Sequence, residues 1–142
     1  MKPRVLFLCT GNSARSQMAE AFLRRYAGDH FDVYSAGLEP KGIHPYTRQV
    51  MAEVGVDISH HTFKDLKQFL GEHFGYLITV CDNAEKNCPI FPGVSVRMHW
   101  PFEDPAHFEG STEETAAKFR EVRDRIDARI RAWLAEQGIA AK

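Results

Sequence analysis

Apolar residues along the chain follow two spacings that alternate. Short, nearly continuous apolar runs are typical of β-strands covered on both faces, and four are present, at residues 4–8, 31–35, 76–80 and 94–99. Between and after them, apolar positions recur every three or four residues, which predicts helices over residues 15–27, 45–54, 63–70 and from the Ser111–Glu114 capping pair to Gly138. Thr62 with Asp65 is expected to start the third helix.

This alternation predicts an α/β fold. Strands that alternate with helices form a parallel, doubly wound sheet, so we expect a flavodoxin-like, three-layer α/β/α domain with a four-stranded parallel sheet in the order 2-1-3-4. Residues 1–142 read as a single domain without internal repeats. Ligands bind such sheets at the carboxyl ends of strands one and three. Cys9 and Cys81 follow these strands, which lie about 4.8 Å apart, so two thiols are expected at one cleft.

Composition narrows the classes of function. The chain has 142 residues and a formal net charge of −1, which gives no reason to expect a nucleic-acid partner. Its apolar N-terminal run is too short for a signal peptide or a membrane span, so we expect a cytoplasmic protein without membrane contact. Three cysteines without an export signal argue against structural disulfides and indicate catalytic, redox or buried thiols.

The loop between the first strand and the first helix carries the strongest chemical signal. A polar turn at a helix N-terminus aims backbone N–H groups at one point, which predicts an oxyanion site formed by Thr10, Gly11, Asn12, Ser13, Ala14 and Arg15. The positive electrostatic field at this helix N-terminus is expected to lower the pKa of the Cys9 thiol, which yields a nucleophilic thiolate. Arg15 is a two-pronged donor to the oxyanion, and Ser16 can donate its hydroxyl to the sulfur. A buried, inert core cysteine is the simpler alternative.

These residues resemble the low-molecular-weight protein tyrosine phosphatase superfamily, which implies a phosphatase I-like fold. The continuation Ser16-Gln17-Met18-Ala19-Glu20 and the later pattern Cys81-Asp82-x5-Cys88-Pro89 are similar to its thioredoxin-coupled arsenate reductase branch. The family's general acid matches Asp104, which precedes Pro105. Expelling hydroxide or an alkoxide requires such a proton donor, although Asp-Pro by itself is a common turn signal.

For Cys81 and Cys88 the resemblance implies a thiol–disulfide relay that detoxifies arsenic. Cys9 attacks arsenate, Asp104 protonates the departing hydroxide, and Cys81 then attacks Cys9 with release of arsenite. Cys88 next forms a Cys81–Cys88 disulfide, which thioredoxin reduces. The implied partners are arsenate, with phosphate or sulfate able to occupy its site, and thioredoxin as the external reductant. We expect a monomer with no tightly bound cofactor and no metal.

The residues between Cys81 and Cys88 must rearrange before these thiols bond. Segment 82–92 is expected to be a polar loop or a short helix. In a helix, positions seven apart lie about 10.5 Å apart along the axis, whereas a disulfide requires Cα atoms about 4.4–6.8 Å apart. The spacing therefore predicts a redox-responsive segment that is more ordered when reduced.

A phosphatase of the same superfamily is the alternative enzyme. It would use Cys9, Arg15 and Asp104 and would hydrolyse a thiophosphate intermediate without the other cysteines. That branch typically has aromatic residues after its Asp-Pro, whereas this chain has Ala106 and His107.

Two further interpretations involve the same cysteines. A zinc site formed by Cys81 and Cys88 with His73 or His99 does not match the usual close spacing of ligand pairs. An oxyanion-binding regulatory domain with oxidation-sensitive thiols is the non-enzymatic alternative.

The chain departs from the resembling proteins at two positions. Many relatives have a second cysteine where this chain has Ala14, but the three-cysteine relay does not require it. Some relatives bind potassium through an acidic residue that matches Lys64 and through positions matching Asn12, Glu20, Ser35 and Thr62. A Lys64 ammonium in the place of the cation, paired with Glu20, predicts weak or absent potassium dependence.

Overall fold

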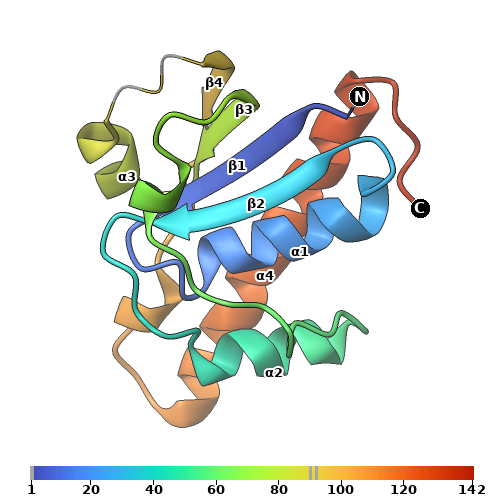
Figure 1. Cartoon of the computed structure of the whole chain (residues 1–142). Coiled ribbons are helices and arrows are strands. Elements are labelled where there is room, and N and C mark those ends of the chain that lie inside the picture. The colour runs from blue at the N-terminus through green and yellow to red at the C-terminus, as the bar shows by residue number, and fades with distance from the viewer. Residues whose placement is uncertain (1, 90, 92) are drawn as a thin grey trace.

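The computed structural model describes residues 2–89, 91 and 93–142 (Figure 1). Its strands are β1 Arg4–Cys9, β2 Asp32–Gly37, β3 Phe74–Thr79 and β4 Val94–His99. Its α-helices are α1 Arg15–Ala27, α2 Pro45–Glu53, α3 Asp82–Asn87 and α4 Thr112–Glu136. Two 3-10 helices are η1 Leu66–Phe69 and η2 Pro105–His107. Residues 90 and 92 of the segment expected to rearrange lie outside the described residues.

The four strands form one parallel sheet in the order β2-β1-β3-β4, which confirms the predicted topology. β1 occupies the interior of the sheet, and its residues Val5 to Leu8 are fully buried. This burial explains why its sequence is apolar without alternation. The strand order reverses between β1 and β3, so their carboxyl ends lie at the switch point of the sheet.

Helices cover both faces of the sheet, as the three-layer prediction requires. Tyr34 and Tyr76 pair with consecutive residues of β1 and therefore point to opposite faces. Tyr76 packs edge-on against Trp133 of α4, with ring centroids 5.2 Å apart, and α1 packs beside α4. On the other face Tyr34 packs against Phe69 of η1 at 5.8 Å. Figure 1 shows α3 beside the carboxyl ends of the strands.

The prediction of a helix over residues 63–70 is wrong. The chain stays extended through residue 65, because Gly37 N–H donates to the Lys64 carbonyl at 2.8 Å and Gly37 forms a parallel bridge with Asp65. Only the short η1 follows, and Asp65, rather than Thr62, caps it by accepting from Lys67 N–H at 2.9 Å. The strand ends also differ: the second runs over 32–37 instead of 31–35, and the third over 74–79 instead of 76–80.

The last helix begins where the sequence predicts. Ser111 and Glu114 form a capping box, with each side chain accepting from the other's backbone N–H at 3.1 Å.

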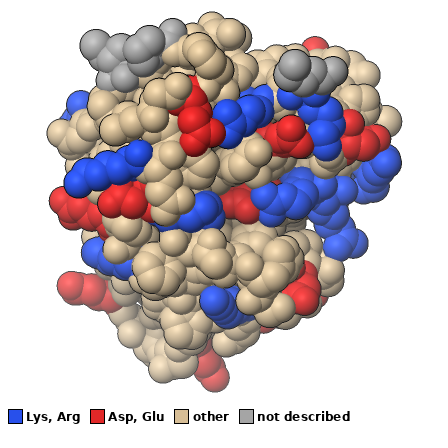
Figure 2. All heavy atoms as spheres, in the orientation of Figure 1, with Lys and Arg blue, Asp and Glu red and all other residues tan. Residues whose placement is uncertain are grey.

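Figure 2 shows basic and acidic side chains interspersed on the visible face of the molecule. Among the described residues, no helix is long and apolar enough to cross a membrane.

Candidate active site

The loop from β1 to α1 forms the floor of a cleft of about 550 Å³ at the carboxyl edge of the sheet. Residues from four separate segments line the cleft: Cys9, Thr10, Gly11, Ser13, Ala14, Arg15, Lys41, Gly42, His44, Cys81, Asp82, Asn83, Phe102, Glu103, Asp104, Ala106 and His107. Every predicted oxyanion-site residue except Asn12 is among them, together with Cys9, Cys81 and Asp104, whereas the predicted Ser16 is not. Asn12 and Ser16 are fully buried behind the loop.

Asn12 holds the loop in its curved form. Its φ is +51°, the only positive φ of a non-glycine residue in the described part of the chain. Its side-chain oxygen accepts from Gln17 Nε2 at 3.0 Å and from Lys64 N–H at 2.8 Å. Across the loop, a Cβ on Gly37 would lie 2.7 Å from the Thr10 carbonyl oxygen, so only glycine allows β2 this close.

A chain of hydrogen bonds directs one proton at the Cys9 sulfur. The Ser35 hydroxyl donates to Glu20, and Asn12 Nδ2 donates to Ser35 Oγ at 3.0 Å and to Ser16 Oγ at 2.8 Å. Ser16 Oγ therefore already accepts a proton from Asn12, so its own hydroxyl is free to donate to Cys9 Sγ, 2.9 Å away. Asn12 N–H also points at this sulfur, at 3.2 Å.

Opposing influences act on the Cys9 thiol. Burial is the largest and raises its pKa above the ordinary value, while the Ser16 hydrogen bond and the positive charge of Arg15 lower it. The net direction is upward, so the expected fall in the pKa is wrong, because Cys9 is only 2% exposed. The Ser16 hydroxyl and the Asn12 N–H, which favour the thiolate, nevertheless lie within hydrogen-bond distance of the sulfur.

The N-terminus of α1 is open to an anion. Ala14 is its N-cap and offers no side-chain hydrogen bond, and the first turn contains no acidic residue. The backbone N–H groups and the positive end of the helix dipole therefore face the cleft without a competing carboxylate from their own helix.

Arg15 connects this loop to the segment that carries Asp104. Its Nη1 donates to the Phe102 carbonyl at 3.1 Å, and its Nη2 lies 3.4 Å from Asp104 Oδ2. Asp104 also caps η2 by accepting from Ala106 N–H at 3.0 Å, and His107 Nδ1 lies 3.5 Å from its Oδ2. The predicted general acid thus faces the cleft beside the predicted oxyanion donor.

Cys81 lies across the cleft from Cys9, as the strand order predicts. It is the N-cap of α3, and its Sγ accepts from Ala84 N–H at 3.4 Å. Thr10 Oγ1 lies 3.5 Å from the same sulfur. Asn83 Nδ2 donates to Thr10 Oγ1 at 2.9 Å, which leaves the Thr10 proton free for Cys81.

Cys88 lies outside the cleft, at the opposite end of α3 from Cys81. It is half-buried, and its Sγ donates to the Pro89 carbonyl at 3.3 Å. Burial raises the pKa of its thiol, and the positive charge of Arg97 opposes that rise. All three cysteines are free, and residues 82–87 between the last two are helical, which agrees with the short helix allowed by the sequence.

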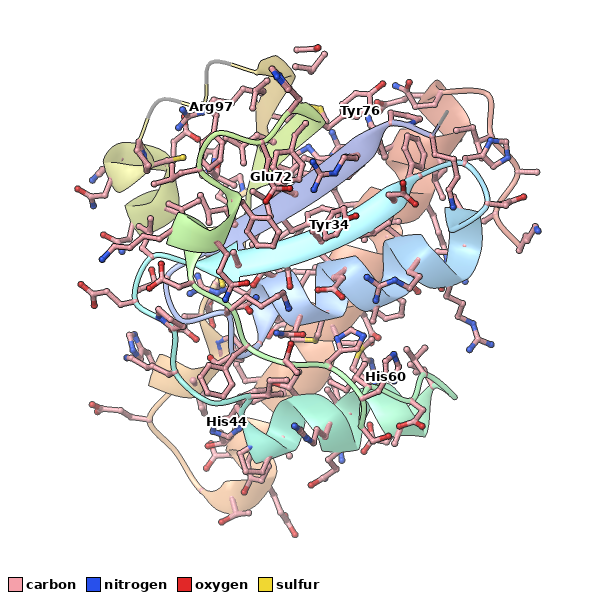
Figure 3. All side chains as sticks on the ribbon, in the orientation of Figure 1. Tyr34, His44, His60, Glu72, Tyr76 and Arg97 are labelled. Atoms are coloured by element: carbon pink, nitrogen blue, oxygen red, sulfur yellow. The ribbon has the colours of Figure 1, made fainter. Side chains whose placement is uncertain are left out.

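Lys41, His44 and Asn83 are among the residues that line the cleft but were not predicted from the sequence as part of the site. His44 caps α2 through Nδ1, which accepts from Tyr46 N–H at 3.0 Å, and its ring packs 4.7 Å from that of Phe119 (Figure 3). Burial lowers the pKa of His44, and Asp104 opposes this. The available signal was its position directly before Pro45, which opens the helix, but a capping role does not predict that the ring lines the cleft.

Lys64 lies beside the buried Glu20, as the sequence analysis predicts. Its Nζ is 3.7 Å from Glu20 Oε1 and donates to the Thr62 carbonyl at 2.6 Å. Burial lowers the pKa of this ammonium, and Glu20 counteracts the effect. Across the described residues, no group of three or more His, Cys, Asp or Glu side chains is arranged to hold a metal ion.

Comparison with known proteins identifies the family. Residues 4–142 match the family described as low molecular weight phosphotyrosine protein phosphatase, and the chain belongs to this family. An arsenate reductase from Halalkalibacterium halodurans is 47% identical over 137 residues, which cover 96% of this chain and 98% of the relative. An arsenate reductase from Bacillus subtilis is 43% identical over 134 residues, or 94% and 96% of the two chains.

Solved structures agree with these relatives. An arsenate reductase in the phosphate binding state superposes with a TM-score of 0.79 at 33% identity and covers 96% of this chain and 98% of its own. A thioredoxin-dependent arsenate reductase from Corynebacterium glutamicum gives 0.74 at 34% identity, over 95% of this chain and 61% of its own. The chain therefore groups with the arsenate reductases of the family, which confirms the resemblance indicated by its motifs.

Proposed function

We propose that this protein reduces arsenate to arsenite through a three-cysteine relay that thioredoxin recycles. The observation that carries the proposal is the meeting of Cys9 and Cys81 at one cleft, with Cys88 one short helix away. The arsenate reductases among its relatives support the same activity. The protein is proposed to work in the cytoplasm, as a monomer and without a tightly bound cofactor.

The first step places arsenate on the loop of residues 10–15. Backbone N–H groups and the Arg15 guanidinium bind its oxygens, and phosphate or sulfate can occupy the same position. The Cys9 thiolate attacks arsenic and forms an S–As bond. Asp104 donates a proton to the departing hydroxide, which leaves as water.

Two exchanges then move the oxidation outward. The Cys81 thiolate attacks Cys9 Sγ and forms an S–S bond, and the electron pair of the broken S–As bond stays on arsenic, which becomes arsenite. The Cys88 thiolate next attacks Cys81 Sγ and frees Cys9 as a thiolate. The two thiols of thioredoxin reduce the Cys81–Cys88 disulfide and become a disulfide themselves.

Turnover with arsenate, thioredoxin, thioredoxin reductase and a reduced nicotinamide cofactor tests the proposal. The wild-type protein is expected to consume cofactor when arsenate is added. Cys88→Ser is expected to release one arsenite per protein and then stop, because no Cys88 thiolate is present to attack the Cys9–Cys81 disulfide and free Cys9. Cys81→Ser is expected to release none. Absence of arsenate-dependent cofactor consumption in the wild type would overturn the proposed function.

The same variants separate the reductase from a phosphatase. Hydrolysis of a model phosphoester requires Cys9, Arg15 and Asp104 but neither of the other thiols. Any such activity is therefore expected to be unchanged in Cys88→Ser. A Cys88→Ser variant that also cycles with arsenate at the wild-type rate would refute the relay.

A further inference from the structure

A cluster of five polar side chains fastens α3 to the sheet; we call it the α3 latch. Thr79 Oγ1 lies 2.5 Å from Glu85 Oε2 and 2.9 Å from His99 Nδ1. His99 Nε2 lies 3.1 Å from Asp82 Oδ1, at the first turn of α3. Arg97 Nη2 donates to the Glu85 carbonyl at 3.1 Å and lies 3.4 Å from its carboxylate. Figure 3 shows Arg97 on the α3 side of the molecule.

With the Asp82 and Glu85 carboxylates ionised, all the hydrogen bonds of the latch can form together only when each His99 ring nitrogen bears a proton. The Thr79 hydroxyl has one proton, and its short contact with the Glu85 carboxylate identifies the acceptor, since the Met98 carbonyl is 3.4 Å away. His99 Nδ1 must then donate to Thr79 Oγ1. The Asp82 carboxylate can only accept, so Nε2 must donate as well. In either neutral tautomer, the ring nitrogen without a proton would face another hydrogen-bond acceptor, either Thr79 Oγ1 or the Asp82 carboxylate.

We propose that His99 is a positioning residue whose doubly protonated imidazole holds α3 in its helical form between Cys81 and Cys88. The charged groups that face it are Asp82 and Glu85 from α3, whose carboxylate oxygens lie 3.1 Å from Nε2 and 3.8 Å from Nδ1. Arg97 on β4 lies 3.4 Å from Glu85 Oε2 and partly offsets that charge. Loss of one proton from His99 breaks its hydrogen bond with Thr79 or with Asp82 and releases α3.

Release of α3 matters because the helix separates the two outer thiols of the relay. Cys81 caps its N-terminus, and Cys88 follows its last residue. Across such a helix the two positions lie about 10.5 Å apart along the axis, too far for a disulfide. The latch therefore sets how often Cys88 can reach Cys81. This role in the relay rests on the proposed function, but the closure of the disulfide can be measured without it.

The test uses a Cys9→Ser protein, in which Cys81 and Cys88 are the remaining thiols. Diamide accepts two electrons and two protons as these thiols form an S–S bond, and the reagent becomes a hydrazine. The rate of thiol loss is compared between the Cys9→Ser protein and the same protein with His99→Gln. At the acid end of the range in which imidazoles titrate, about pH 5 to 8, His99→Gln is expected to close about fivefold faster. Towards the alkaline end the ratio is expected to approach one.

Taking the ratio at each pH removes the general rise in thiolate with pH. His30→Gln is the matched control: His30 also lies beside an aspartate, at 3.9 Å from Asp29, but far from α3 in the fold, and its ratio is expected to be one throughout. Asp82→Asn removes the exposed partner of the latch and is expected to accelerate closure as His99→Gln does. The double variant is expected to be no faster than either single variant, because both break the same link.

Three results would overturn the proposal: a His99→Gln ratio that does not change with pH, an Asp82→Asn protein that closes no faster, or additive effects in the double variant. Nitrogen NMR of the wild-type ring at the acid end is expected to show both His99 nitrogens protonated. Asp82 is largely exposed, so Asp82→Asn keeps the fold and decides the outcome even if His99→Gln does not fold. A Cys9→Ser protein cannot reduce arsenate, so failure here is distinct from failure of the reductase proposal.

Discussion

At the scale of single residues, the reactivity of Cys9 depends on the few groups around its sulfur. Burial favours the neutral thiol, and the Ser16 hydroxyl and the Arg15 charge favour the thiolate. Asn12 determines which way the Ser16 proton points, because its amide already occupies Ser16 Oγ. The Ser16 hydrogen bond is therefore the group whose loss should change the ionisation of Cys9 most directly.

Replacing Ser16 by alanine is expected to raise the pKa of Cys9 further. Since a thiol is neutral below its pKa, the rate of Cys9 alkylation by iodoacetamide rises with pH, and its midpoint should move up by about one pH unit in Ser16→Ala. The measurement uses a Cys81→Ser, Cys88→Ser background. Ser13→Ala, which alters the same loop without touching the sulfur, is the control. An unchanged midpoint in Ser16→Ala would contradict the assignment of the Ser16 proton.

Lys64 is expected to determine whether the protein responds to potassium. Its ammonium lies 3.7 Å from the buried Glu20, so thermal stability of the wild type is expected to be the same in sodium and potassium salts. Lys64→Asp puts a second carboxylate there, and potassium at ten times its Kd should stabilise that variant by about 1.4 kcal/mol. Lys67→Asp, on the exposed side of η1, is the control. A marked stabilisation of the wild type by potassium would refute the prediction that the Lys64 ammonium takes the place of the potassium ion.

At the scale of elements, the active loop keeps its shape because β2 lies directly against it. Gly37 faces Thr10 and Asn12, and its backbone also holds the segment around Lys64 in place. One strand end therefore supports both the oxyanion loop and the Lys64–Glu20 pair. The loop is positioned by contacts from elements distant in the sequence as well as by its own residues.

Gly37→Ala is expected to distort the oxyanion loop. The added Cβ would lie 2.7 Å from the Thr10 carbonyl oxygen and 2.9 Å from Asn12 N, and neither backbone atom can move independently of the loop. We expect destabilisation of about 1–3 kcal/mol in urea unfolding and weaker sulfate binding. Gly42→Ala, whose Cβ meets nothing within 4 Å, is the matched control. Equal sulfate affinity in both variants would show that the close approach does not shape the site.

At the scale of the whole molecule, one small helix differs from the rest of the scaffold. α1 packs on α4 and on the sheet, and Trp133 of α4 packs on Tyr76 of β3, whereas only Ala84 of α3 is buried. An element with few buried apolar contacts opens at low free energy. The fold thus combines a stable oxyanion loop with a thiol-carrying segment that can rearrange.

Oxidation of Cys81 and Cys88 is expected to loosen α3 alone. Hydrogen exchange over residues 82–89 should become faster in the oxidised protein, because the helix cannot persist with its ends joined by a disulfide. Amides of α1 and α4 serve as the internal control and should keep their protection. Equal protection of residues 82–89 in both redox states would refute the redox-responsive segment.

Sequence reasoning reached the sheet order and the site because both depend on local patterns. Continuous apolar runs separated by helices require parallel strands, and the switch point then brings Cys9 and Cys81 to one cleft. It failed for residues 63–70, where bonds to Gly37 hold the chain extended against a helical pattern. It also missed His44 in the cleft, since a capping residue does not reveal what its ring faces.

The sequence alone determined the family, the topology and the candidate reactive residues, because these follow from apolar periodicity and from residue types at short spacing. Only the tertiary structure decided which groups favour or oppose the ionisation of Cys9 and which of those residues lie close enough to react. The pKa of Cys9, the proton given by Ser16, the separation of Cys88 from the cleft and the contacts of His99 all depend on groups from distant parts of the chain. Burial and hydrogen-bond direction arise only when the elements pack, and no local pattern encodes them.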